Sequence, residues 1–253
     1  MYTIRHFLRP DSLEEAYQTL LHARNNTVLG GCMWLRLGKR AIGTAIDLSS
    51  LGLDQITDTG DCIEIGAMVT LRQLETSGLL QQYFGALFCD AVSGIVGTQF
   101  RNTATVGGSI YGRFGFSDVL TAFLALPTQI KTCRHGILPL EEFASLPYEK
   151  DIVECLILPK QAVTCSYQHI RFQATDFPIL ACAVGMQADN TYRIAVGARP
   201  ARACVAYVGT APDPDVIAES LPYADNMRAS AAYRRQVCPV LIRRALEEVQ
   251  ICK

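Results

Sequence analysis

The chain has 253 residues, of which 49% are hydrophobic and 19% are charged, and its formal net charge is −1. This composition excludes a disordered chain, which is poor in apolar residues, and the near-zero charge provides no basic surface for nucleic acid or an anionic membrane. The first residues lack the apolar segment of a secretory signal, and no apolar run is long enough to span a bilayer, so we expect a cytoplasmic protein.

The first third of the chain alternates short strands and helices. Ser12 and Glu15 have the spacing of a capping box, which predicts a helix that begins after Ser12. The apolar face expected for this helix consists of Leu13, Ala16, Tyr17, Leu20 and Leu21. Strands are predicted at 27–29, 45–48 and 62–65. A second helix is expected after Thr70, which has the same capping-box spacing to Gln73.

The middle third contains two apolar helices with a polar segment between them. The first predicted helix covers 84–96, and a polar, glycine-rich loop follows at 98–109. Ser117 and Asp118 are good N-cap residues for the second helix, which is predicted at 119–126. Further strands are predicted at 129–133 and 152–157.

The last third is predicted as a small sheet followed by helices. We place a boundary within 159–163, and we predict strands at 165–172, 179–186 and 192–196. From Arg228 the chain is rich in Ala, Arg, Leu and Glu, which predicts a helix or helix pair interrupted at Pro239. The fold class is therefore α+β, with one domain at 1–160 and a second at 161–253.

The ten cysteines are scattered along the chain, and none forms a C-x-x-C pair or a Cys/His cluster. Zinc and iron–sulfur sites need several ligands that converge within a short loop, and disulfides are rare in a reducing cytoplasm. The cysteines are therefore predicted to be small buried side chains, and we expect no metal site in this chain.

Two double-glycine segments are the main candidates for a binding site, because nucleotide-binding and hydrolase motifs such as G-x-G-x-x-G and G-x-S-x-G are absent. The first pair is Gly30-Gly31 and the second is Gly107-Gly108, and each follows a β-prone run. Paired glycines permit positive φ angles and leave room for backbone N–H groups to converge on an anion such as a pyrophosphate. Each segment taken alone is better explained as a tight turn or a bulge, and the two together favour a binding site only modestly.

The residues around the second pair resemble a family signature. The run from Gln99 to Gly108 reads QFRNTATVGG and is followed by Ser117-Asp118. It is similar to the FAD-binding subunit of the molybdenum hydroxylases, the family of xanthine dehydrogenase, carbon monoxide dehydrogenase and nicotinate dehydrogenase. Further segments match the same family in the same order: 7–16, 46–48, 65–70, 176–178 and 228–235. The resemblance therefore covers nearly the whole chain.

The resemblance implies a fold and a set of cofactor-binding residues. It implies an FAD-binding domain of the vanillyl-alcohol-oxidase or PCMH type in two lobes, followed by a C-terminal domain with a small sheet and a helical bundle. The first FAD segment would be Asn26, Thr27, Val28, Leu29, Gly30, Gly31, Cys32, Met33 and Trp34. The second would be Ala104, Thr105, Gly107, Gly108 and Ser109, with backbone amides on the pyrophosphate. The other matching positions are Ile95, Tyr111 and Gly112 near the cofactor, Ser117 and Asp118 as polar contacts, Leu156 as an apolar flavin contact, and His169 where some relatives place a lysine.

Two of these positions also have purely structural interpretations. Asp118 is suited to capping the helix that follows it, and His169 is equally compatible with a surface histidine. No residue is assigned as a catalytic acid or base, since the cofactor supplies the chemistry.

The sequence departs from the family pattern in two places. The first segment commonly ends with two small polar residues and a leucine in relatives, whereas this chain has Cys32, Met33 and Trp34. The loop after the second glycine pair carries Arg113, Phe114 and Phe116 where relatives have small residues and a proline. FAD binding is expected to survive with lower affinity, and Arg113 is a candidate to compensate by pairing with phosphate.

The function implied by the resemblance is electron transfer. An FAD subunit of this kind passes electrons from iron–sulfur clusters on a partner to NAD+ or another acceptor. Its expected partners are a molybdopterin-binding large subunit and a 2Fe-2S small subunit. Two alternatives remain at this point: a scaffold subunit of the same fold with weakened or lost flavin binding, and a stand-alone flavin oxidoreductase.

Overall fold

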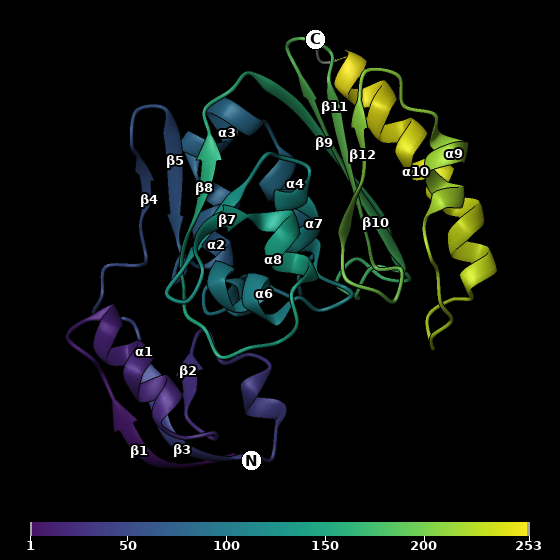
Figure 1. Cartoon of the computed structure of the whole chain (residues 1–253). Helices are drawn as coiled ribbons and strands as arrows, with labels where there is room; N and C mark the ends of the chain where they lie inside the picture. Colours follow the sequence, from purple (N-terminus) through teal and green to yellow (C-terminus); the bar gives the residue numbers. More distant parts are fainter. Residues whose placement is uncertain (1, 252–253) are drawn as a thin grey trace.

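A small parallel sheet and one helix form the N-terminal lobe (Figure 1). The computed structural model describes residues 2–251 of the chain. The elements of this lobe are β1 (Thr3–Leu8), α1 (Leu13–His22), β2 (Thr27–Leu29), the 3-10 helix η1 (Leu35–Leu37) and β3 (Ala41–Asp47). The strands lie in the order β1-β3-β2, and both pairings are parallel. Helix α1 packs on this sheet through Ala16 and Leu20.

The start of α1 confirms the predicted cap. The Ser12 hydroxyl accepts a hydrogen bond from the Glu15 N–H at 3.1 Å. The predicted apolar face is right except at Leu21, which is 42% exposed. Leu21 follows the buried Leu20 by one residue, and one residue rotates a helix position by about 100°.

The middle lobe holds an antiparallel sheet and most of the helices. Its strands are β4 (Ile56–Asp58), β5 (Cys62–Gly66), β6 (Gln129–Thr132), β7 (Gly136–Pro139) and β8 (Val153–Pro159), in the order β4-β5-β8-β6-β7. Its helices are α2 (Leu71–Thr76), α3 (Gly78–Phe84), α4 (Leu87–Ser93), α5 (Thr98–Arg101), α6 (Val106–Gly112), α7 (Asp118–Leu124) and α8 (Leu140–Ser145). The main hydrophobic core lies between these helices and the sheet.

Two predictions in this lobe need correction. The helix expected at 84–96 is present as α4 but is shorter, because Gly85, with a φ of 57°, ends α3 before it and α4 itself ends at Ser93. The loop expected at 98–109 is wrong, because this segment contains α5 and α6. Helix α6 forms because the Thr105 hydroxyl caps it, accepting a hydrogen bond from the Gly108 N–H at 3.2 Å.

The C-terminal part is an antiparallel sheet covered on both faces. Strands β9 (Val163–Ile170), β10 (Leu180–Gln187), β11 (Tyr192–Gly197) and β12 (Cys204–Gly209) lie in the order β12-β11-β10-β9, followed by α9 (Pro214–Ser220) and α10 (Ala231–Ile251). Helix α10 covers one face, and α4 and α7 pack against the other (Figure 1). The expected interruption at Pro239 does not occur, since α10 continues through it with Cys238 and Ile242 buried against the sheet.

The chain changes sheets between Pro159 and Val163, close to the predicted boundary. The main core nevertheless crosses this point, because Tyr167 and Ala183 of the C-terminal sheet belong to the same cluster as Phe123 of α7. The division into domains 1–160 and 161–253 stays a prediction. Within residues 2–251, no helix has both the length and the apolar composition needed to cross a membrane.

Candidate functional site

The two glycine segments lie directly against each other. A Cβ built on Gly30 would lie 2.9 Å from Oγ1 of Thr105 and 3.7 Å from Cα of Gly108. A Cβ on Gly31 would lie 2.0 Å from the carbonyl oxygen of Thr103. The two segments, separated by more than 70 positions in the sequence, therefore pack backbone against backbone and leave no room for side chains at these glycines.

The expected positive φ angles are not at the glycines. Neither pair contains a glycine with positive φ, whereas the neighbouring Cys32 has a φ of 57°. Gly30 and Gly31 are needed because a Cβ would collide with the opposite segment, whereas a Cβ at Gly107 would collide with Ala67. The turn of the first segment is made at Cys32. The Cys32 thiol donates to the carbonyl oxygen of Gly30 at 3.3 Å, and burial raises the pKa of this thiol, with a smaller contribution from the charge of Asp47.

The first segment offers free backbone donors. The N–H groups of Gly31 and Met33 have no hydrogen-bond acceptor among residues 2–251, and they flank the left-handed Cys32. Consecutive amides around a left-handed residue form a concave anion site. The first segment is thus chemically suited to hold a phosphate group.

The amides of the second segment are already used within the chain. The Gly107 N–H donates to the carbonyl oxygen of Ala67 at 2.8 Å, and the Ser109 N–H donates to that of Thr105 at 3.1 Å. The Gly108 N–H is the one that caps α6 on the Thr105 hydroxyl. The expectation that these amides point at a pyrophosphate therefore does not match their geometry, which instead fixes α6 beneath the first segment.

Residues 26–29 mainly support the first segment. The Asn26 side chain is buried, donates to the carbonyl oxygen of Thr19 at 2.7 Å and accepts the N–H of Thr44 at 2.9 Å. Thr27, Val28 and Leu29 pair with β3 as strand β2. Strand β2 therefore ends directly before Gly30 and sets the position of the first segment.

Asp118 forms a buried network rather than facing solvent. It is the first residue of α7, which Ser117 caps by accepting the N–H of Leu120 at 3.1 Å. Oδ1 of Asp118 accepts hydrogen bonds from Nη2 of Arg171, at 2.7 Å, and from the Tyr167 hydroxyl. Burial raises the pKa of Asp118 to about 6, although Arg171 opposes this rise.

Arg171 connects this network to the other predicted positions. Its Nη1 donates to the carbonyl oxygen of Asp176 at 2.8 Å. Its Nε–H is buried and has no partner within the described residues. The guanidinium also lies beside Gly94, the residue before the predicted Ile95, where a built Cβ would be 3.7 Å from Cζ. Apart from its position two residues after His169, no sequence signal pointed to Arg171.

His169 lies at the surface on the same strand, with its ring centroid 5.9 Å from that of Tyr167. Partial burial, followed by the positive charge of Arg171, lowers the pKa of His169 to about 4. The imidazole is therefore neutral near pH 7 and does not replace the charge of a lysine.

The remaining predicted positions surround the same region of the middle lobe. Ile95 is half-buried against the main core, and Leu156 of β8 and Ala104 are buried in it. The Tyr111 hydroxyl donates to the carbonyl oxygen of Glu149, and the carbonyl oxygen of Gly112 accepts the hydroxyl of Tyr148. These contacts hold the end of α6 in place.

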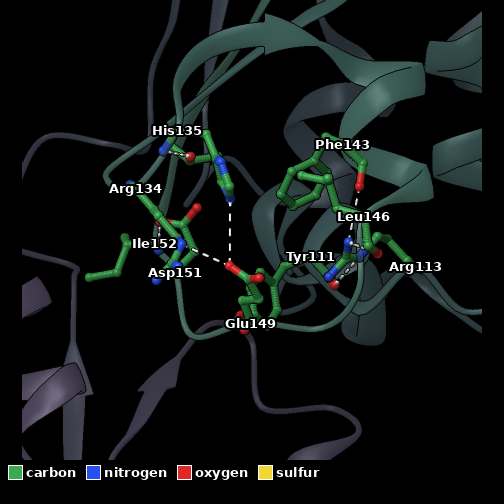
Figure 2. A network of polar contacts seen from close by, with 10 residues as sticks. Tyr111, Arg113, Arg134, His135, Phe143, Leu146, Glu149, Asp151 and Ile152 are labelled. Carbon is green, nitrogen blue, oxygen red and sulfur yellow. Dashed lines mark hydrogen bonds and ion pairs between the residues drawn. The ribbon is translucent and has the colours of Figure 1, made fainter.

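Arg113 does not serve as a phosphate ligand. Its side chain is buried, and Figure 2 shows the guanidinium directed at the carbonyl oxygens of Phe143 and Leu146. Both Nη1 distances are 3.0 Å. Arg113 takes a left-handed conformation, with a φ of 43°, which turns its side chain into the protein after α6.

An aromatic cluster joins three segments of the site, and the sequence did not predict it. The cluster consists of Trp34, Phe114, Phe116 and Phe177, with neighbouring ring centroids 4.3 to 5.6 Å apart. Trp34, Phe114 and Phe116 occupy positions at which the sequence departs from the family pattern. This departure is the sequence signal that could have indicated the cluster. Beside the cluster lies a pocket of about 240 Å³, lined by Gly115, Phe116, Phe177, Pro178, Ala198, Pro200, Asn226 and Arg228.

Metal ligands do not converge in the described part of the chain. No group of three or more His, Cys, Asp or Glu side chains within residues 2–251 is arranged to hold a metal ion. The nine cysteines of this range are all free thiols.

Comparison with known proteins gives one family. Residues 2–161 match the sequence model of the FAD binding domain in molybdopterin dehydrogenase. The chain is 26% identical to the uncharacterized protein YgfM of Escherichia coli K12, over 94% of each chain. It is 23% identical to the nicotine 6-hydroxylase medium subunit of Paenarthrobacter nicotinovorans, over 96% of each chain. The structure of reconstituted CO dehydrogenase from Oligotropha carboxidovorans has the same fold, with a TM-score of 0.86, 21% identity and 97% of each chain covered.

Proposed function

Because the chain belongs to the family of FAD-binding domains of molybdopterin dehydrogenases, we propose that it is the FAD-carrying electron-transfer subunit of a molybdenum hydroxylase complex. The observation that carries the proposal is the convergence of the two glycine segments, with the free N–H groups of Gly31 and Met33 at their junction. A nucleotide cofactor needs such a backbone donor site for its phosphates.

The residues present fit FAD at two places. The amides of Gly31 and Met33 would hold the pyrophosphate, above the packed Thr105 and Gly108. The buried, unpartnered Nε–H of Arg171 marks a second place that lacks an acceptor. FAD supplies the capacity to take up and release electrons, and the protein supplies binding, orientation and the local charge.

The residues of this chain would orient the flavin and shield it from water. The Ser117 cap fixes the start of α7, and the contact of Asp118 with Arg171 holds α7 against the end of β9. The aromatic cluster packs Trp34 against Phe177. The burial of Asp118 and Arg171 excludes water from their contact and strengthens the local electrostatic interaction.

We further propose the assembly in which this subunit works. Nicotine 6-hydroxylase contains a medium subunit related to this chain over nearly its full length, which supports an association with a molybdopterin-binding large subunit and a 2Fe-2S small subunit. In this assembly electrons arrive from the iron–sulfur clusters of the small subunit. NAD+ is the proposed acceptor among soluble oxidants, and the complex is proposed to be cytoplasmic.

Purification of the protein together with its co-expressed partner subunits tests the proposal. The expected result is a yellow complex whose flavin is released on denaturation and identified as FAD by chromatography. A complex that is colourless and releases no flavin contradicts FAD binding.

A scaffold subunit with lost flavin binding is the second candidate. The aromatic cluster favours it, because Phe114 lies in a loop that carries small residues and a proline in the family pattern, and its partner Trp34 replaces a smaller leucine. A stable complex with the partners that contains no flavin is the result expected of a scaffold.

A further inference from the structure

A buried ion pair lies among the predicted cofactor residues. Asp118 is itself one of them, and Arg171, the residue directly after β9, follows His169 by two positions. The Arg171 guanidinium also packs beside Gly94, which precedes Ile95. Residues from the α4–α5 connection, the start of α7 and the chain directly after β9 therefore meet at this one pair.

The pair is protected from solvent. The side chains of Arg171 and Asp118 are 3% and 5% exposed, and Nη2 lies 2.7 Å from Oδ1. Charges at such positions are weakly screened by salt and act strongly on their neighbours. Each charge of the pair therefore influences any redox group bound nearby.

Arg171 is a permanent charge, whereas its neighbour His169 is not. A guanidinium stays protonated at all accessible pH values, while the low pKa of His169 leaves that ring neutral near pH 7. The unpartnered Nε–H of Arg171 adds a donor that no residue within 2–251 satisfies.

We propose that the Asp118–Arg171 pair sets the reduction potential of the flavin, with Arg171 favouring the reduced ring and Asp118 favouring the oxidised one. The inference rests on the proposed function, since it requires bound FAD. If FAD is bound, its full reduction would take two electrons, delivered one at a time by the partner's iron–sulfur cluster, and one proton from solvent, which would leave one extra negative charge on the flavin ring. A nearby cation stabilises that charge and a nearby anion destabilises it.

The proposal predicts shifts of opposite sign for the two partners. In the purified complex, Arg171→Gln removes the cation and lowers the midpoint potential. Asp118→Asn removes the anion and raises the potential, while its amide oxygen still accepts from Arg171 and Tyr167. The double variant returns toward the wild-type potential. The measurement is a redox titration followed by flavin absorbance at about pH 8, above the pKa of Asp118.

Two controls separate charge from structure. Arg171→Lys keeps the charge and is expected to keep the potential close to that of the wild type. The FAD content of every variant is measured after extraction, because a merely structural pair lowers occupancy in both single variants without shifting the potential in opposite directions.

Shifts in the same direction, or no shift in either variant that retains FAD, overturn the inference. If Arg171→Gln does not fold, Asp118→Asn decides alone: a raised potential supports the inference, and an unchanged or lowered one overturns it. A wild-type complex without flavin overturns the proposed function and this inference with it.

Discussion

At the scale of single residues, the site depends on where a side chain is missing. Gly30 and Gly31 are required because the opposite segment occupies the place of their Cβ atoms. These glycines stood out in the sequence for two reasons, positive φ angles and missing Cβ atoms, and only the second applies here. The collision partner of Gly31, the carbonyl oxygen of Thr103, lies far along the chain and follows no local pattern.

Gly31→Ala is expected to destabilise the protein and to lower its FAD content. The new Cβ would lie 2.0 Å from the Thr103 carbonyl oxygen, so the two segments must move apart. Overpacking of this kind costs about 1–3 kcal/mol. Urea unfolding and flavin extraction measure the two effects. Gly78→Ala is the control, because nothing lies within 4 Å of its Cβ, and it should leave both quantities nearly unchanged.

His169 gives a pH dependence of known sign. The pKa of His169 falls from 6.5 to about 4 on folding, so the unfolded chain binds the proton more readily. This residue therefore contributes full stability above pH 6.5, and that contribution is lost as the pH falls toward about 4. Asp118 acts in the opposite direction over part of this range, since folding raises its pKa to about 6.

The comparison of wild type with His169→Gln isolates the histidine. As the pH is lowered from 7 to about 4.5, the free energy of unfolding of the wild type is expected to fall more than that of His169→Gln. Urea titrations at a series of pH values measure this difference. A difference that stays constant with pH means that His169 titrates normally in the folded protein.

At the scale of elements, the sequence predicted those features that depend on neighbouring residues alone, such as the starts of helices. The capping boxes at Ser12 and Thr70 identified the starts of α1 and α2, because each box involves only four neighbouring residues. Strands β1, β4, β7 and β12 were not predicted. All four are edge strands of their sheets, and their side chains do not alternate between buried and exposed positions.

The site shows the same limit. The motif residues Thr105, Ser117 and Asp118 were recognised from the sequence, and the structure places them at helix caps and in one buried network. Arg171 and the aromatic cluster were not found, because their contacts join positions that are distant in the sequence. Asp118 and Arg171, for example, are 53 residues apart.

The close packing of the C-terminal sheet on α7 depends on Gly185 of β10. A Cβ at this position would lie 2.5 Å from the carbonyl oxygen of Ala125, a backbone atom that cannot rotate away. Gly185→Ala is therefore expected to lower the free energy of unfolding by about 1–3 kcal/mol. Gly97→Ala is the control, since its Cβ meets nothing within 4 Å. Equal urea midpoints for the two variants would show that the sheet can move away from α7 at little cost.

At the scale of the whole molecule, the predicted domain boundary and the hydrophobic core do not coincide. The family match ends at residue 161, where β8 has ended and β9 has not begun. Tyr167 and Ala183 nevertheless lie in the same core cluster as Phe123. The buried network of Asp118 with Arg171 also crosses this boundary. The two parts are therefore expected to depend on each other for stability.

The fragment 1–160 alone is expected not to unfold cooperatively, because removal of β9 and β10 exposes the apolar face of α4 and α7. Urea unfolding of the fragment, monitored by circular dichroism, tests its cooperativity. Binding of a dye that reports exposed apolar surface tests the exposure of this face. The matched control is the full chain carrying a protease site at the exposed Gln161-Ala162. After cleavage the two pieces should remain associated and unfold in one transition, since the shared core is intact. A fragment 1–160 that unfolds cooperatively with the midpoint of the full chain would show instead that the family domain folds independently of the sheet that covers it.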